Sequence, residues 1–210
     1  HLGINYYDAN PDSSRARARN RMGIRSDNDD RLTFADIDNT QSDTEWVLET
    51  AVQFEGLRFQ TEYFQRDFSG EDDSGQDSSV NLNGYYGQLS YLLNGSREYN
   101  KSSGKWGKPS QIGAIELFAR YESSTIDADE NAISDDLNNN VDGIFVEDAT
   151  NNFKTDAWVV GVNYFPVPAI RMSLNYVEYQ VDNIDTSSSI DNESVTDNGK
   201  AIMGRLQYSF

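Results

Sequence analysis

Arginine recurs at every second position in one short stretch of the sequence, at Arg15, Arg17, Arg19 and Arg21, and once more at Arg25 after a three-residue interruption. If the stretch is extended, alternate side chains point to the same side, about 6.6 to 7 Å apart. A guanidinium is permanently charged and pairs with phosphate through two parallel hydrogen bonds. Such a row could replace the hydration shell of an anion stepwise as the anion moves along a pore. Arg25 is the weaker extension of the row.

A second interpretation is that the arginines offset nearby carboxylates such as Glu45, Glu49 and Glu62 in a mixed polar lining. The whole chain carries 17 basic and 35 acidic residues, a net charge of −18, and an acidic pore mouth would repel phosphate. The residues alone leave both interpretations open.

The composition argues against several classes of function. The chain has no cysteine and one histidine, His1, which disfavours thiol chemistry, a histidine-based triad and a multi-histidine metal site. We therefore expect neither enzyme activity nor a cofactor. The charge disfavours nucleic acid as a partner, and no apolar run reaches the roughly 18 residues of a membrane helix. Residues 138–143 resemble the start of a calcium loop, but Ala149 stands where a glutamate is needed, so no metal site is predicted.

Period-two alternation of apolar and polar residues predicts about ten strands and no helix, an all-β antiparallel chain. The clearest strands are expected at residues 45–54, 57–63, 85–94, 115–122, 158–165, 170–176 and 200–210, with shorter ones at 2–8, 15–25 and 31–37.

The polar face of these strands is suited to a water-filled lumen, whereas the apolar face carries tyrosines and tryptophans near strand ends, as interfacial girdles do. We therefore favour a transmembrane β-barrel, with a soluble or surface all-β binding protein as the alternative. The lumen-facing residues expected are Glu45, Glu49, Arg58, Glu62, Arg66, Glu116, Arg120, Glu122, Arg171 and Arg205.

The connections also point to a membrane barrel. Long acidic segments at 69–80, 127–153 and 183–199 alternate with tight turns at 55–56 and 166–168. Long loops at one end and short turns at the other are typical of bacterial outer-membrane barrels. Residues 95–111, which include Lys101, Lys105 and Lys108, form a long connection where a short turn is expected.

Several segments resemble the phosphate-selective porin O and P family, and the resemblance covers most of the chain from about residue 15 onward. The segments that carry it are NGYYGQLSY at 83–91, LNGSREY at 93–99, GAIELFARY at 113–121, GVNYF at 161–165, RMSLNY at 171–176 and GRLQYSF at 204–210.

The resemblance implies a sixteen-stranded, trimeric barrel integral to the outer membrane of a Gram-negative bacterium, of which residues 1–210 would be the C-terminal part. A smaller barrel of about ten strands is the alternative. The arginines at 15, 17, 19 and 21 would correspond to the arginine ladder of the family's phosphate-selective members, and Phe210 would be the assembly signal. The partners implied are small anions, outer-membrane lipid and lipopolysaccharide, and two further copies of the chain.

These observations predict an outer-membrane porin that passes small anions, with phosphate as the candidate solute, by diffusion through an arginine-lined lumen. A general porin of low selectivity is the alternative within transport.

Overall fold

The computed structural model describes residues 1–11, 14–21, 23–24, 32–71, 75–102, 104–133, 152–183 and 196–208. Within these ranges no helix is long and apolar enough to cross a membrane. The elements are β1 (Leu2–Ala9), β2 (Ser14–Asn20), β3 (Leu32–Phe54), β4 (Leu57–Glu71), β5 (Asp77–Leu92), β6 (Tyr99–Asn100), β7 (Lys105–Trp106), β8 (Ala114–Ala128), the 3-10 turn η1 (Glu130–Ala132), β9 (Asn152–Val167), β10 (Ile170–Asn183) and β11 (Thr196–Tyr208).

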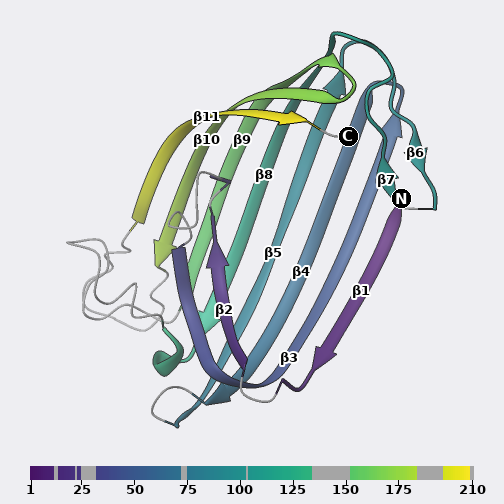
Figure 1. The fold of residues 1–210 in the computed structure, drawn as a ribbon. Coiled ribbons are helices and arrows are strands. Elements are labelled where there is room, and N and C mark those ends of the chain that lie inside the picture. The colour runs from purple at the N-terminus through teal and green to yellow at the C-terminus, as the bar shows by residue number, and fades with distance from the viewer. Residues whose placement is uncertain are drawn as a thin grey trace.

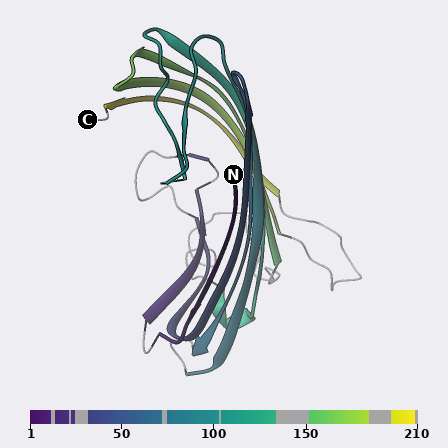
Figure 2. The same ribbon diagram turned by 90° about the vertical axis from the view of Figure 1, so that its right-hand side faces the viewer.

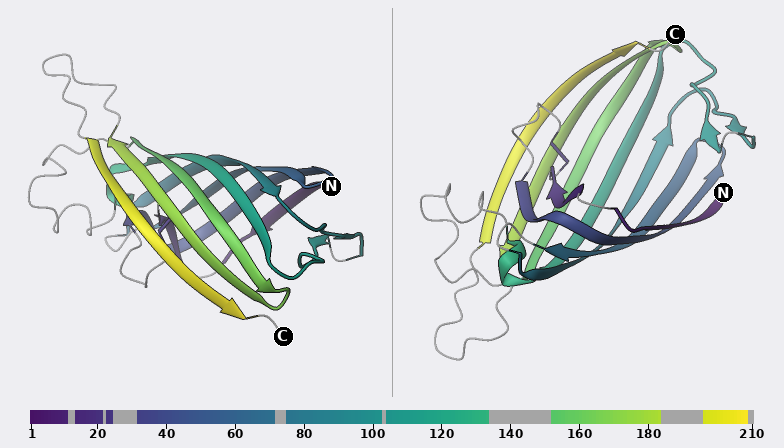
Figure 3. Two further views of the ribbon diagram at one scale, coloured as in Figure 1. Left: turned by 90° about the horizontal axis from the view of Figure 1, so that it is seen from above. Right: turned by 60° about the horizontal axis from the view of Figure 1, so that its bottom comes forward.

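The long strands form one antiparallel sheet in the order β1-β3-β4-β5-β8-β9-β10-β11, and β2 pairs with β3 outside this path. The all-β prediction is therefore confirmed. Figure 1 shows the long strands side by side, and the view from above shows that they form a curved sheet (Figure 3, left). Because no pairing joins β1 to β11 in the described ranges, closure into a barrel stays a prediction.

The two faces of the sheet differ as the alternation predicted. On β9, Trp158, Val160 and Tyr164 are 55%, 45% and 43% exposed, whereas Val159 between them is 6% exposed. The exposed apolar side chains of the other long strands alternate in the same way, as on Leu57 and Phe59 of β4. This continuous apolar face is the outer, convex one, because β2 lies on the opposite, concave side of the curved sheet (Figure 2).

The two ends of the sheet also differ. The turns β3–β4 and β9–β10, the start of β1 and the end of β11 lie at the upper end in Figure 1, whereas β4, β8 and β10 end and β5, β9 and β11 begin at the lower end. We call these the turn end and the loop end. The connection between β5 and β8, which contains the short hairpin β6–β7, lies at the turn end as expected.

Several strand boundaries were wrong: β4 extends to Glu71 and β5 begins at Asp77, within the connection expected at 69–80. The strands expected at 31–37 and 45–54 are a single strand, β3, whose last residues pair with β1 and β4. Its first residues pair with β2, and Ala35 also forms an isolated bridge with Ile133. The β3–β4 register shifts between Thr40 and Ser42, and such irregularities bend a strand. Gly70 of β4 permits the bend, since a Cβ there would lie 2.1 Å from the carbonyl oxygen of Asn39.

The bend carries β2 and the start of β3 over the concave face, where they bury an apolar core at the loop end (Figure 2). Phe34 of β3 is fully buried and packs on Phe153 of β9, with ring centroids 5.3 Å apart. The core joins β2, β3, β4, β5, β8, β9 and β10 through Ala16, Ala18, Phe34, Ala35, Ile37, Phe68, Val80, Ile126, Ala128, Ala132, Phe153 and Val181. We call residues 14–21, 23–24 and 32–38 the folded-in segment.

Candidate functional site on the concave face

The arginine row lies on the folded-in segment, in the extended conformation that the sequence predicted. Ala16 and Ala18 of β2 are buried in the apolar core, so the intervening arginines point to the opposite side of the strand. Strand β2 ends at Asn20, earlier than expected, and Arg21 follows it. Arg25 lies outside the described residues.

Carboxylates of β3 neutralise the first half of the row. Arg15 forms ion pairs with Asp36 and with Asp38, the latter at 2.8 Å between Nε and Oδ1. Arg17 lies next to the same Asp36, with 3.8 Å between its Nε and Oδ2. This arrangement follows from the β2–β3 register, in which Arg17 is directly opposite Asp36.

The second half of the row is held against the sheet by Asn20. Its amide nitrogen donates to Ser124 Oγ of β8 at 3.2 Å and to Thr155 Oγ1 of β9 at 2.9 Å. Sequence reasoning missed this residue, although a signal exists: Asn20 follows Ala16 and Ala18 on the buried side of β2, where a polar group needs a partner. Asn20 thereby fixes the positions of its neighbours Arg19 and Arg21.

Arg19 lines a hollow of about 220 Å³ against β4, β5 and β8. The charged wall residues there are Glu62, Arg120 and Glu122. Arg120 Nε donates to Glu122 Oε2 at 2.9 Å, and its guanidinium lies 3.7 Å from the ring centroid of Tyr86. Arg21 lines a larger hollow, of about 670 Å³, with Arg120, Arg171 and Arg205.

A buried ion-pair network lies toward the turn end. Glu116 of β8 is 5% exposed and forms ion pairs with Arg97 at 2.9 Å and Arg58 at 3.6 Å. Asn163 of β9 donates to its other carboxylate oxygen at 3.0 Å. Burial lowers the pKa of the Arg97 guanidinium, an effect that Glu116 opposes.

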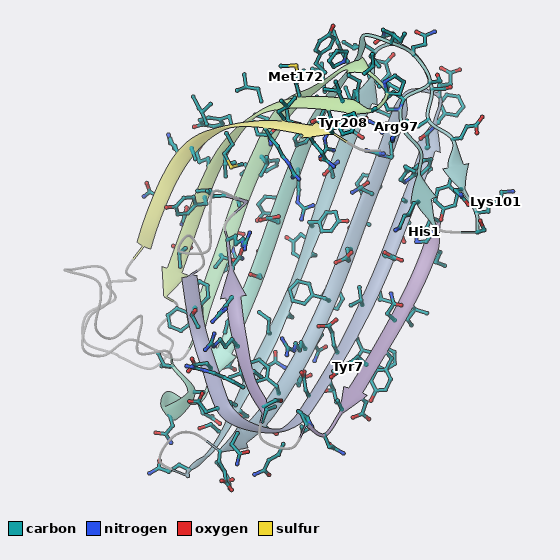
Figure 4. All side chains as sticks on the ribbon, in the orientation of Figure 1. His1, Tyr7, Arg97, Lys101, Met172 and Tyr208 are labelled. Carbon is teal, nitrogen blue, oxygen red and sulfur yellow. The ribbon has the colours of Figure 1, made fainter. Side chains whose placement is uncertain are left out.

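Arg97 belongs to the connection between β5 and β8 and attaches it to the sheet at the turn end (Figure 4). Its carbonyl oxygen accepts a hydrogen bond from Gln53 Nε2 at 3.0 Å, and its guanidinium lies 5.0 Å from the ring centroid of Phe165. Sequence reasoning placed Glu116 and Arg58 on the polar face but missed Arg97 and Asn163, because their contacts join segments that are distant in the sequence.

The remaining predicted lumen residues also lie on the polar face. Glu45 and Glu49 are on β3, and Glu49 Oε1 lies 3.0 Å from His1 Nε2. Arg66 of β4 forms a two-point ion pair with Asp43, 2.8 Å at each contact. Phe210 and the calcium-loop resemblance at 138–143 lie outside the described residues. Among the side chains that the structure describes, no group of three or more histidine, aspartate or glutamate residues could hold a metal ion.

Comparison with known proteins agrees with this arrangement. The family model of the phosphate-selective porin O and P matches residues 1–210. Porin O of Pseudomonas aeruginosa is 31% identical to this chain over 232 residues, an alignment that covers 100% of this chain and 49% of the relative. The chain thus spans about half the length of that relative. It belongs to the phosphate-selective porin O and P family and is an integral protein of the bacterial outer membrane.

Proposed function

We propose that the protein forms a water-filled channel through which small anions, phosphate among them, diffuse under the control of an arginine row in the lumen. The observation that carries the proposal is the placement of the row: β2 is folded over the concave face, and Arg19 and Arg21 line hollows there. Family membership supports a channel, removes the alternative of a soluble binding protein and agrees with a function without covalent chemistry.

The proposed mechanism is stepwise exchange of hydration for guanidinium contacts. Arg15, Arg17, Arg19 and Arg21 present donors at regular intervals from the loop end toward the middle of the sheet. A fixed array of charges attracts anions locally even where the whole protein is acidic, since nearby charges dominate the field in a narrow passage. Ordering by Asn20 and by the apolar core keeps the guanidinium groups in place, so little reorganisation is needed as an anion passes.

A general porin of low selectivity is the second candidate. It is favoured by Asp36 and Asp38, which neutralise Arg15 and Arg17, and by Glu45, Glu49 and Glu62 on the same wall. The two candidates differ in the charge selectivity of the open channel.

The test is the zero-current potential of the full-length protein in a planar bilayer under a salt gradient, with and without added phosphate. We expect an anion-selective sign and block by phosphate, both reduced in R19Q/R21Q. The matched control is K154Q/K200Q, which removes two positive charges from the outer face of β9 and β11. A cation-selective or unselective channel would establish the general porin instead. A homotrimer and contacts with lipopolysaccharide stay predictions.

A further inference from the structure

The residues that line the larger hollow on the concave face are typical of a ligand-binding site. Its volume is about 670 Å³, within the range of small-molecule sites. Asn20, Arg21 and Gly23 of the folded-in segment lie on one side of it, and strands β5, β8, β9, β10 and β11 supply the wall.

The hollow has an excess of three positive charges. Its one carboxylate, Glu122, is paired with Arg120. Over the part of the chain that the structure describes, Arg21, Arg171 and Arg205 have no carboxylate within ion-pair distance. A dianion would therefore be balanced there without displacing an internal ion pair.

Arg171 and Arg205 supply two of these charges from neighbouring strands. In the β10–β11 register Arg171 is opposite Gln207 and Arg205 is opposite Ser173, so the two arginines are diagonal neighbours on the same face. Arg171 is oriented by donating to Gln207 Oε1 at 2.7 Å, and its Nε is buried without a hydrogen-bond partner. Two adjacent guanidinium groups without a carboxylate repel each other, and a bound anion with several acceptor oxygens relieves that repulsion.

Beside Gln88 and Asn175, the rest of the lining includes apolar side chains that inorganic phosphate does not need. Phe118 of β8, Val159 of β9 and Met203 of β11 line the same hollow. An anion that carried an apolar group could bury that group against these side chains while its oxygens contacted the arginines. A bare phosphate ion gains nothing from this surface.

We propose that this hollow binds phosphate monoesters of small organic molecules, with the phosphate on Arg171, Arg205 and Arg21 and the organic group against Phe118 and Met203. The inference rests on the proposed function, because the ligand reaches the hollow through the channel. It adds a second class of solute to the channel and a place where that solute is retained.

The probe is phenyl phosphate, compared with inorganic phosphate and benzoate as blockers of chloride current through the full-length protein in planar bilayers. We expect phenyl phosphate to block at a concentration about fivefold or more below that of inorganic phosphate, because its ring buries apolar surface. R171Q/R205Q should raise the blocking concentration of phenyl phosphate about tenfold, since charge-assisted hydrogen bonds are lost. The control K154Q/K200Q removes the same number of charges from the outer face and should leave the block unchanged.

Three results would overturn the inference. The first is a phenyl phosphate block no tighter than that of inorganic phosphate in the unaltered protein, a comparison that needs no variant to fold. The second is an R171Q/R205Q channel of normal conductance whose phenyl phosphate block is unchanged. The third is a benzoate block as tight as that of phenyl phosphate. Calorimetric titration of the detergent-purified protein with phenyl phosphate separates the two proposals. If the protein binds phenyl phosphate but its channel is not anion-selective, the binding site in the hollow stands and selectivity by the arginine row is rejected.

Discussion

The first two arginines of the row and its last one, Arg21, follow the same spacing in the sequence but have opposite electrostatic surroundings. Arg15 and Arg17 face Asp36 and Asp38 of β3, whereas Arg21 faces a hollow that also receives Arg171 and Arg205. The difference arises because β3 pairs with the whole of β2 but places Asp36 beside Arg17 and Thr33 beside Arg19. The regular spacing in the sequence thus shows on which side of β2 the arginines lie. The neighbouring strand determines whether their charge is available to an anion.

The largest effect is expected from Glu116→Gln, which breaks the anchor at the turn end. Removing the charge leaves the mostly buried Arg58 and Arg97 without this carboxylate, and breaking a buried ion pair costs about 4 kcal/mol of unfolding free energy. Denaturant unfolding in detergent micelles measures the loss, and open-channel noise should rise as the β5–β8 connection detaches. Glu178→Gln is the control, because its ion pair with Lys200 is exposed; an equal loss in both variants would contradict the prediction.

Phe34→Ala should break the anchor at the loop end. The ring is fully buried against Phe153, and truncation of a buried phenylalanine costs about 3 kcal/mol. We expect lower unfolding free energy and loss of anion selectivity, since the folded-in segment carries the row. Phe59→Ala on the exposed outer face provides the comparison, and unaltered selectivity in a destabilised Phe34→Ala channel would show that the core does not position the arginines.

Asn20→Ala tests whether the position of Arg19 and Arg21, and not only their charge, matters for anion binding. The variant keeps every arginine but loses hydrogen bonds to Ser124 and Thr155, a change worth about 1 to 2 kcal/mol. We expect phosphate block to weaken severalfold, about as much as in Arg21→Gln, which removes one charged contact with the anion. Zero-current potentials and phosphate titrations of Asn20→Ala and Arg21→Gln measure this; a block as tight as in the unaltered channel would show that Asn20 is not a positioning residue.

The smallest effect is expected from Asp36→Asn, which frees Arg17 from its carboxylate and leaves Arg15 paired with Asp38. Loss of the Asp36 charge should raise the anion-to-cation permeability ratio about twofold, since partly exposed ion pairs contribute less than about 1 kcal/mol. Asp127→Asn, an exposed carboxylate of β8, removes the same charge elsewhere. Equal shifts in both variants would mean that net charge, rather than pairing within the row, sets the selectivity.

Strand positions and faces could be read from the sequence with good accuracy. The alternation on β9 and on β10 identified which side chains are exposed, and the turn at 55–56 was located correctly. These features depend on neighbours two residues apart or on a single turn, so local chemistry determines them. Most of the polar side chains on the concave face were assigned to one side of the strands for the same reason.

The full length of β3, and the pairing of its first residues with β2, could not be predicted from local patterns. Residues 32–38 pair with β2 rather than with β4, and only this pairing brings Asp36 beside Arg17. The network around Glu116 depends likewise on Arg97 and Asn163, which lie 19 and 47 residues away along the chain. Contacts of this kind follow from sheet order and register, which have no local signature.

The sequence by itself therefore determined the class of fold, the two faces of the sheet and the presence of an arginine row on one side of an extended strand. Period-two alternation carries all three, because side-chain direction in a strand depends only on odd or even position. The tertiary structure decided that β2 folds over the concave face, which arginines are neutralised and which line a cationic hollow. Those outcomes depend on the bend of β3 and on packing between distant strands, where the free energy comes from burial and ion pairing across the sheet.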